Sequence, residues 1–195
     1  GRGPGAAGQE RRGGYIGVGQ TGAVYFFTGL AGAGKTTIGS LFYERLKEQS
    51  PSAVLFDGDQ LRSAAGDFCP NTGAILKAER YTTEARRAGA YSTFRLCRDL
   101  AEQGKDVVVC SISMYSDVRR WNRENIRHYR EIYVKVSRET LYRRDQKKLY
   151  SSGVKNVVGV DLPYDEPGHS HVVIQNDGEE TPEAIVNRLA EEFGL

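Results

Sequence analysis

The eight residues from Gly29 to Thr36, Gly-Leu-Ala-Gly-Ala-Gly-Lys-Thr, match the pattern G-x-x-x-x-G-K-[ST] and constrain the fold more than any other segment. An apolar run, 23–28, precedes them and a helix-like run, 37–49, follows them. The glycines let backbone N–H groups turn inward around a phosphate, and the following helix directs its positive end to the same point. A glycine-rich turn that binds nothing requires neither the lysine nor this strand–loop–helix context. We therefore predict a phosphate-binding loop, with phosphate contacts from Gly29, Ala31, Gly32, Ala33, Gly34, Lys35, Thr36 and Thr37.

Short apolar runs alternate with longer amphipathic runs from Ala23 onward, which is typical of an α/β fold with a parallel sheet. The expected strands are 24–28, 53–56, 107–112, 132–136 and 172–174. The expected helices are 36–49, 76–103, 118–129, 138–147 and 182–193. This order predicts a three-layer sandwich around a mainly parallel, five-stranded sheet, the fold of kinases with a phosphate-binding loop.

The length of 195 residues suits one domain, which we place at 23–195 after a flexible leader, 1–22, rich in glycine and arginine. The formal charge of +2 predicts neither a nucleic-acid nor a membrane partner, and no apolar run approaches the ~18 residues of a membrane helix. Three cysteines without metal-ligand spacing indicate reduced thiols and a cytoplasmic location. The only methionine is Met114, so the given sequence does not begin at an initiator residue. A processed product, a tagged protein and a piece of a longer polypeptide all stay open.

Two carboxylates, Asp57 and Asp59, follow the second expected strand, and Arg62 comes three residues later. Ligands of parallel sheets bind beyond the carboxyl ends of the strands, so these residues should lie near the phosphates. The carboxylates are suited to hold Mg²⁺ through water or to accept a proton from an attacking hydroxyl, and Arg62 to grip an anion. A solvated Asp-Gly-Asp turn is the alternative, and the position next to a phosphate loop favours function.

Basic and hydroxyl side chains continue this pattern further along the chain. One expected helix carries five arginines, most of which we expect to be exposed, with one or two reaching a substrate: Arg80, Arg86, Arg87, Arg95 and Arg98. Ser111 and Ser113 follow the third strand, where a hydroxyl is equally suited to contact a substrate anion or to cap the next helix. Arg144 and Lys147 precede a glycine-containing segment, which favours a mobile lid over a merely charged helix end.

Several of these motifs, in this order, resemble the adenylylsulfate kinase family from about Val24 to the end of the chain. The shared segments are the phosphate loop with Thr37-Ile38, Asp57-Gly58-Asp59-x-x-Arg62, Phe68, Arg86-Arg87-x-Gly89, Ile112-Ser113, Arg144-Asp145-x-Lys147 and 159–167. The resemblance implies transfer of the γ-phosphate of ATP to the 3′-hydroxyl of adenylylsulfate with Mg²⁺, and it suggests a homodimer.

The resemblance also implies roles for individual residues. Lys35, Asp57 and Asp59 would be catalytic; Thr36, Asp57 and Asp59 would serve the metal; Arg144 and Lys147 would close over the nucleotide. The acceptor would be bound by Asp59, Arg62, Phe68, Arg80, Arg87, Ile112, Ser113 and Lys147.

The chain departs from the family pattern around the acceptor. Gln60 stands where the family has Asn, Ser111 and Met114 replace Phe and Pro around Ile-Ser, and Val157 replaces an aromatic residue. Loss of one stacking face would cost about 1–3 kcal/mol of base binding. The segments 121–125 and 156–161 resemble a divergent branch of the family, so a kinase of another nucleotide conjugate, such as cytidine diphosphoramidate in capsule modification, is the alternative.

Two other functional classes are less consistent with the sequence. A GTPase-like switch needs an Asn-Lys-x-Asp guanine reader, which the sequence lacks. A silent scaffold has no physical need for Lys35, Thr36 and two carboxylates together. Acceptor-dependent consumption of ATP would distinguish a kinase from both.

Overall fold

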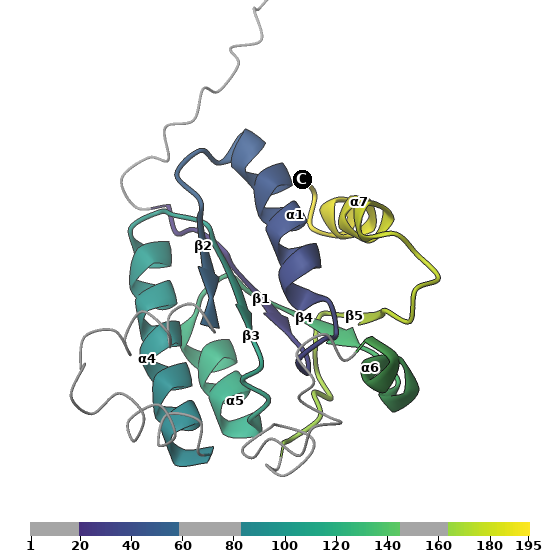
Figure 1. Ribbon diagram of the computed structural model, residues 1–195. Coiled ribbons are helices and arrows are strands. Elements are labelled where there is room, and N and C mark those ends of the chain that lie inside the picture. Colours follow the sequence, from purple (N-terminus) through teal and green to yellow (C-terminus); the bar gives the residue numbers. More distant parts are fainter. Residues whose placement is uncertain (1–19, 59–82, 145–163) are drawn as a thin grey trace, which may run out of the picture.

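The computed structural model describes residues 20–58, 83–144 and 164–195, and within them the chain forms one parallel sheet covered by helices on both faces (Figure 1). The strands are β1 (Val24–Thr28), β2 (Val54–Asp57), β3 (Val107–Ser111), β4 (Tyr129–Lys135) and β5 (Val172–Gln175). The helices are α1 (Lys35–Gln49), α4 (Thr83–Glu102), α5 (Ser116–Asn125), α6 (Arg138–Arg144) and α7 (Pro182–Glu192). The strand order is β2-β3-β1-β4-β5, and the α/β class and the five-stranded parallel sheet are confirmed.

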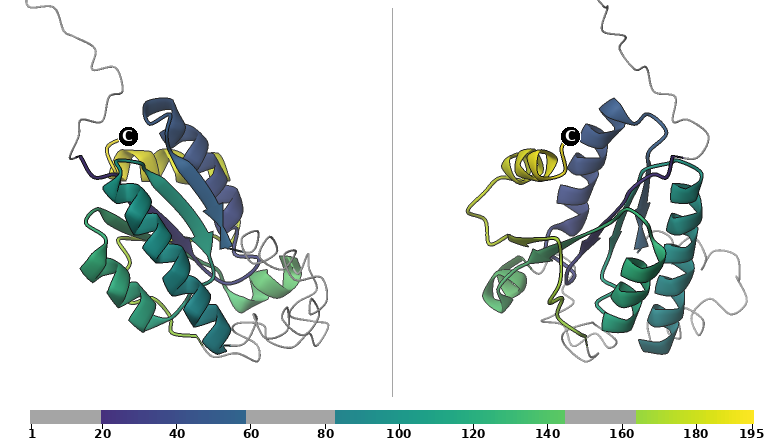
Figure 2. Two further views of the ribbon diagram at one scale, coloured as in Figure 1. Left: turned by 90° about the vertical axis from the view of Figure 1, so that its left-hand side faces the viewer. Right: turned by 180° about the vertical axis from the view of Figure 1, so that it is seen from behind.

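Alternating side chains of the buried strands explain the three layers. Val24 and Phe26 of β1 face one side of the sheet, where they pack with α4 and α5. Tyr25 and Phe27 face the other side and pack with α1 and α7. Both faces of β1 are therefore apolar, as expected for a central parallel strand. Figure 2 shows the helices on either side of the sheet.

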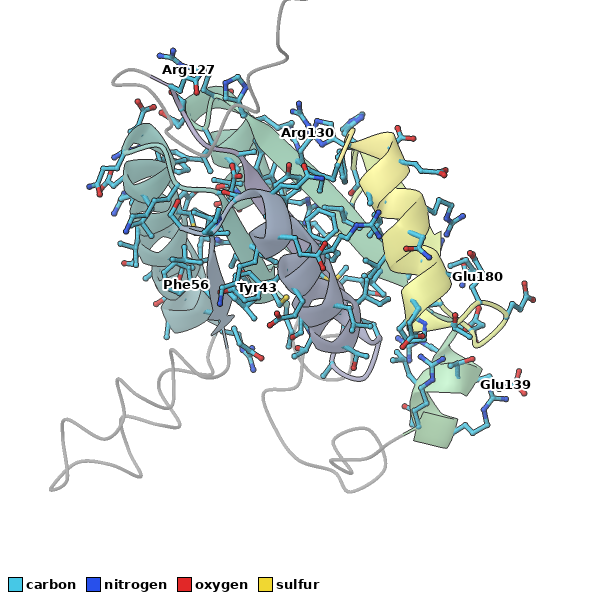
Figure 3. All side chains as sticks on the ribbon, turned by 90° about the horizontal axis from the view of Figure 1, so that it is seen from above. Tyr43, Phe56, Arg127, Arg130, Glu139 and Glu180 are labelled. Atoms are coloured by element: carbon cyan, nitrogen blue, oxygen red, sulfur yellow. The ribbon has the colours of Figure 1, made fainter. Side chains whose placement is uncertain are left out.

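The helices α1 and α7 share one layer and are tied to each other by a polar contact. Arg45 of α1 donates a hydrogen bond to Asn187 of α7 at 3.0 Å. Figure 3, seen from above, shows α1 with Tyr43 beside α7, with Glu180 just before it. In the same view Arg127 and Arg130, at the amino end of β4, lie far from Glu139 of α6. The arginines thus mark the edge of the sheet opposite to the one from which α6 extends.

The register of the sheet brings the functional segments to one edge. Thr28, the last residue of β1, pairs with Ser111 of β3 on one side and with Tyr133 of β4 on the other. Asp57, the last residue of β2, pairs with Cys110. The phosphate loop, the Asp57 segment and the Ser111 segment therefore leave the sheet at neighbouring points.

The predicted boundary between the helix expected at 118–129 and the strand expected at 132–136 is wrong. The helix α5 ends at Asn125, and the next residue, Ile126, is extended and buried. The strand β4 begins already at Tyr129. The charged residue Glu131 made this stretch look polar, but its side chain is 1% exposed and accepts hydrogen bonds from Tyr129 at 2.6 Å and from Ser170 at 2.7 Å.

The other predicted elements agree with the structure to within one or two residues wherever they are described. The predicted stretches 76–82 and 145–147, the lid and most of the leader lie outside the described residues. Gly22 donates a hydrogen bond to the carbonyl of Ala101 at 2.8 Å, so this residue is already attached to the fold. Among the residues that the structure describes, no helix has the length and hydropathy that crossing a bilayer requires.

Two of the three cysteines, Cys97 and Cys110, are described, and both are free thiols in the core. Burial raises the pKa of each to about 12. The expectation that Cys110 is a core residue is confirmed, and at neutral pH both groups are inert thiols.

The aromatic contacts of α1 give a test of the core. Phe42 is fully buried, with its ring 4.9 Å from that of Tyr25 and 5.4 Å from that of Phe27. Phe42→Ala should lower the free energy of unfolding by about 3–5 kcal/mol, because it removes these contacts and leaves a cavity. Urea unfolding followed by circular dichroism measures the change. Leu96→Ala, at an exposed position of α4, is the control and should change stability by less than about 0.5 kcal/mol. Equal effects of the two variants would contradict this assignment of the core.

Candidate active site

The phosphate loop is held in a tight backbone path between β1 and α1. A Cβ atom on Gly29 would lie 2.5 Å from the carbonyl oxygen of Val134, so the loop rests directly on the backbone of β4. Gly34 has φ +95°, a left-handed conformation that glycine adopts without strain. Among the described residues, no side chain caps the N-terminus of α1 at Gly34. The first N–H groups of this helix are therefore suited to bind an anion.

Lys35 and Thr36 open the helix α1 with different exposure. Lys35 is only 7% exposed, and its Nζ lies 3.5 Å from the carbonyl oxygen of Leu30, within the loop. Thr36 is exposed, and its Oγ1 lies 3.5 Å from Oδ2 of Asp57 at the end of β2. The structure thus brings together the predicted lysine, hydroxyl and carboxylate from two separate segments. A hydroxyl and a carboxylate oxygen beside a phosphate loop form a donor set that fits Mg²⁺, which favours oxygen ligands and retains several waters.

The segment after β3 forms the wall next to Asp57. Ser111 and Ser113 share a hydrogen bond of 2.8 Å between their hydroxyls, and the carbonyl of Ile112 accepts one from Thr28 at 3.0 Å. Gly58 packs against Ser111, since a Cβ atom there would lie 2.9 Å from Ser111 Oγ. The predicted residues Ile112 and Ser113 therefore lie beside the carboxyl ends of β1 and β2.

Neither serine caps the following helix, so that alternative is wrong. The backbone N–H and the hydroxyl of Ser116, at the start of α5, both donate to Asp165, at 3.0 and 3.1 Å. These hydrogen bonds hold the pKa of Asp165 below its usual range. The cap comes from a residue almost fifty positions further along the chain, and the serine hydroxyls remain available for a ligand.

Arg87 of α4 is fixed beside the same wall. Its guanidinium lies over the ring of Tyr115, 5.1 Å from the centroid, and its Nε lies 3.2 Å from Asp117. The hydroxyl of Tyr91 donates to the same carboxylate at 3.2 Å. The ion pair uses Nε, so the terminal nitrogens of the guanidinium are not needed for it. Sequence reasoning missed Asp117 and Tyr115; their signal was only their position just after the Ile-Ser segment.

The remaining described arginines of α4 differ from Arg87. Arg95 lies over the ring of Tyr91 and Arg98 over the ring of Trp121, on the side where α4 meets α5. Arg98 also contacts its neighbour Asp99 at 3.3 Å. Arg95 is exposed, as expected for most arginines of this helix, whereas Arg98 is half-buried.

The chain that follows residue 163 returns to the same edge of the sheet. Asp165 donates its N–H to the carbonyl of Met114 at 2.7 Å, and Tyr133 donates to Glu166 at 3.2 Å. Tyr164 packs against a small apolar cluster of Ile112, Met114 and Tyr133 with Leu30 and Ala31 of the phosphate loop. The carboxyl ends of β1, β3 and β4 are therefore joined by this segment.

Five predicted site residues lie outside the described residues, so their roles stay predictions: Asp59, Arg62, Phe68, Arg80 and Lys147. Arg144, the last described residue of α6, lies beside Gly178, where an added Cβ would be 4.0 Å from its Nη2. Sequence reasoning also missed Asn176, which donates to the carbonyl of Ala33 in the phosphate loop at 2.8 Å. The sequence Asn-Asp-Gly after the last strand predicts a turn, but only the fold shows that this turn contacts the phosphate loop.

Comparison with known proteins agrees with this geometry. The family model described as adenylylsulphate kinase matches residues 21–175. The cytidine diphosphoramidate kinase of Campylobacter jejuni is 35% identical over 174 residues, covering 86% of this chain and 96% of that protein. The adenylyl-sulfate kinase of Pseudomonas aeruginosa is 35% identical over 173 residues, covering 86% of this chain and 83% of that one.

Among solved structures, the Mycobacterium tuberculosis APS kinase CysC in complex with AMPPNP and APS superposes with a TM-score of 0.74 at 21% identity, covering 90% of this chain and 99% of that chain. At that identity the likeness supports the fold. The match of the family model over most of the chain, together with the two relatives, supports more: the chain belongs to the adenylylsulphate kinase family and is a phosphotransferase that acts on a hydroxyl group.

Proposed function

We propose that this protein transfers the γ-phosphate of ATP, with Mg²⁺, to a hydroxyl of a small nucleotide conjugate. The observation that carries the proposal is the placement of Thr36 Oγ1 3.5 Å from Asp57 Oδ2, at the mouth of a phosphate loop whose helix has no side-chain cap within the described residues. A phosphoryl group is stabilised by this combination of backbone N–H groups, a lysine and metal-binding oxygens.

In this proposal each described residue of the loop has a distinct task. The N–H groups at the start of α1 bind phosphate oxygens, and Lys35 neutralises charge on the β- and γ-phosphates. Thr36 and Asp57 would hold Mg²⁺, which neutralises charge that develops on the phosphates. Asp59 accepts the proton of the attacking hydroxyl, and Arg144 and Lys147 close over the nucleotide; the parts assigned to Asp59 and Lys147 rest on the sequence alone.

Arg87 would bind the anionic group of the acceptor. Stacking on Tyr115 and pairing with Asp117 hold its guanidinium in one orientation before any ligand binds. Such preorganisation reduces the entropy lost on binding and favours bidentate contact with a phosphate or sulfate. Ser113, two residues before Tyr115, would contribute a hydroxyl to the same acceptor.

Two acceptors are compatible with this site. Adenylylsulfate is the acceptor that the family resemblance implies, and the Pseudomonas relative carries that activity in its name. Cytidine diphosphoramidate is the alternative, and two observations support it as an equal candidate. The Campylobacter relative is equally similar over nearly its whole length. The residues at the end of β3 also depart from the family pattern, with Ser111 bonded to Ser113 and Met114 buried at 1% exposure.

A cytoplasmic location is part of the proposal, supported by the free thiols of Cys97 and Cys110 and by the use of ATP. The homodimer stays a prediction from the resemblance.

A coupled ADP-release assay with ATP and Mg²⁺ tests the reaction and identifies the acceptor. We expect turnover only when a nucleotide conjugate is added, and we compare adenylylsulfate with cytidine diphosphoramidate at equal concentrations. The preferred acceptor should show the higher kcat/KM by at least about tenfold, because a mismatched base leaves polar groups in the pocket unpaired. ADP release at the same rate without any acceptor, or none with either, would refute the proposal.

The contact between Thr36 and Asp57 predicts a metal effect. Thr36→Ala and Asp57→Asn should each raise the Mg²⁺ concentration needed for half-maximal turnover, because each removes an oxygen ligand or its charge. A magnesium titration at saturating ATP measures this shift. Ser40→Ala, which removes a hydroxyl one turn further along α1, is the matched control. Identical magnesium curves for wild type, Thr36→Ala and Asp57→Asn would exclude this pair from the metal site.

The clamped guanidinium gives a prediction for the acceptor. Arg87→Ala should raise the KM for the acceptor roughly 10- to 100-fold, which is the loss of a hydrogen bond to a charged group of about 1.5–3 kcal/mol. The KM for ATP should stay the same. Arg95→Ala, at an exposed position on the same helix, should change neither value. A change in the KM for ATP, with the KM for the acceptor unchanged, would contradict the role assigned to Arg87.

A further inference from the structure

A turn after β5, formed by Asn176, Asp177 and Gly178, contacts both sides of the nucleotide site. The side chain of Asn176 donates to the carbonyl of Ala33 at 2.8 Å, and its backbone N–H donates to the carbonyl of Lys135 at 2.7 Å. Asn176 thus links the end of β4 to the phosphate loop, although it is far from the loop in the sequence.

The hydrogen bond to Ala33 fixes the direction of a peptide group within the loop. Described peptide bonds are trans, so the carbonyl of Ala33 and the N–H of Gly34 point in opposite directions. Holding the carbonyl toward Asn176 therefore turns the N–H of Gly34 away from it. In a phosphate loop the backbone N–H groups bind the anion, so the orientation of this donor is part of the binding site.

The space around Gly34 shows that Asn176 packs closely against the phosphate loop. A Cβ atom on Gly34 would lie 2.5 Å from Nδ2 of Asn176, so a larger residue would displace the amide. Glycine is thus required here by its φ of +95° and also by the approach of Asn176. The two residues form one packed unit.

The next two residues of the turn contact α6, the helix that ends in Arg144. Asp177 accepts hydrogen bonds from the N–H of Ser137 at 2.9 Å and from its hydroxyl at 3.1 Å, just before α6 begins. These bonds hold the pKa of Asp177 well below its usual range, so the residue is ionised at neutral pH. Gly178, with φ +98°, lies beside the guanidinium of Arg144.

We propose that Asn176 is a positioning residue of the nucleotide site, acting on the polyphosphate through the peptide group between Ala33 and Gly34. Asp177 attaches the start of α6 to the same turn. The phosphate loop and the helix that carries Arg144 are therefore held in a fixed position relative to each other. The inference rests on the proposed binding of a nucleoside triphosphate, and it assigns to Asn176 a part in binding the phosphates rather than the acceptor.

Two variants of Asn176 test this inference, and they differ in whether they add a charge at this position. Asn176→Asp keeps the shape but replaces the donor with a carboxylate, and Asn176→Ala removes the donor without adding charge. Asn187→Ala, an exposed asparagine on α7 that bonds Arg45, is the matched control. The measurements are ATP affinity by calorimetry with Mg²⁺, the KM for ATP and for the acceptor, and the melting temperature with and without ATP.

We expect both Asn176 variants to weaken ATP binding and raise the KM for ATP by about 3- to 10-fold, the value of one hydrogen bond. The KM for the acceptor should not change, and the rise in melting temperature that ATP causes should shrink. A merely structural role would instead lower the melting temperature of the free protein and leave ATP affinity unchanged in the folded fraction, which would overturn the inference.

The outcome is distinguishable from failure of the proposed function. Wild-type protein that binds ATP but phosphorylates neither acceptor would refute the proposed reaction, while the binding measurements would still decide the role of Asn176. Wild-type protein that binds no ATP would overturn both proposals. ATP binding that neither Asn176 variant alters would overturn this inference alone.

Discussion

The site depends on how closely the backbone of the phosphate loop approaches the end of β4. A side chain at Gly29 would meet the carbonyl of Val134 at 2.5 Å, so the chain can leave β1 along this path only with glycine. The central position of β1, hydrogen-bonded on both sides to β3 and β4, fixes where the loop starts. The position of the loop is therefore set by a strand that is buried at every residue.

Contacts that are distant in the sequence then complete the site around the loop. Asp57 reaches it through the β2–β3 register, and the hydroxyls of Ser111 and Ser113 are oriented by each other. Asp165 caps α5 and so frees those hydroxyls from a structural task. Asp165 thus supports this segment, and Asp57 and Ser113 remain available for chemistry.

Buried polar groups away from the site show how the fold accommodates charge. Glu131 is almost fully buried, but it accepts two short hydrogen bonds and has Arg123 at 3.8 Å. A buried charge is tolerated only when other groups solvate it, and such solvation comes from tertiary contacts. For that reason the hydropathy pattern around Tyr129–Glu131 misplaced the boundary between α5 and β4.

The sequence alone was sufficient to predict the phosphate loop, the α/β class, five strands and the family, because these depend on local patterns: glycine spacing, apolar alternation and motif order. It also named Lys35, Thr36 and Asp57, which the fold brings together. Only the tertiary structure decided that Ser113 does not cap α5, that Arg87 is held by Tyr115 and Asp117, and that Asn176 supports Ala33. The physical reason is that a hydrogen bond or stacking contact between distant segments depends on strand order and register, which no local pattern in the chain encodes.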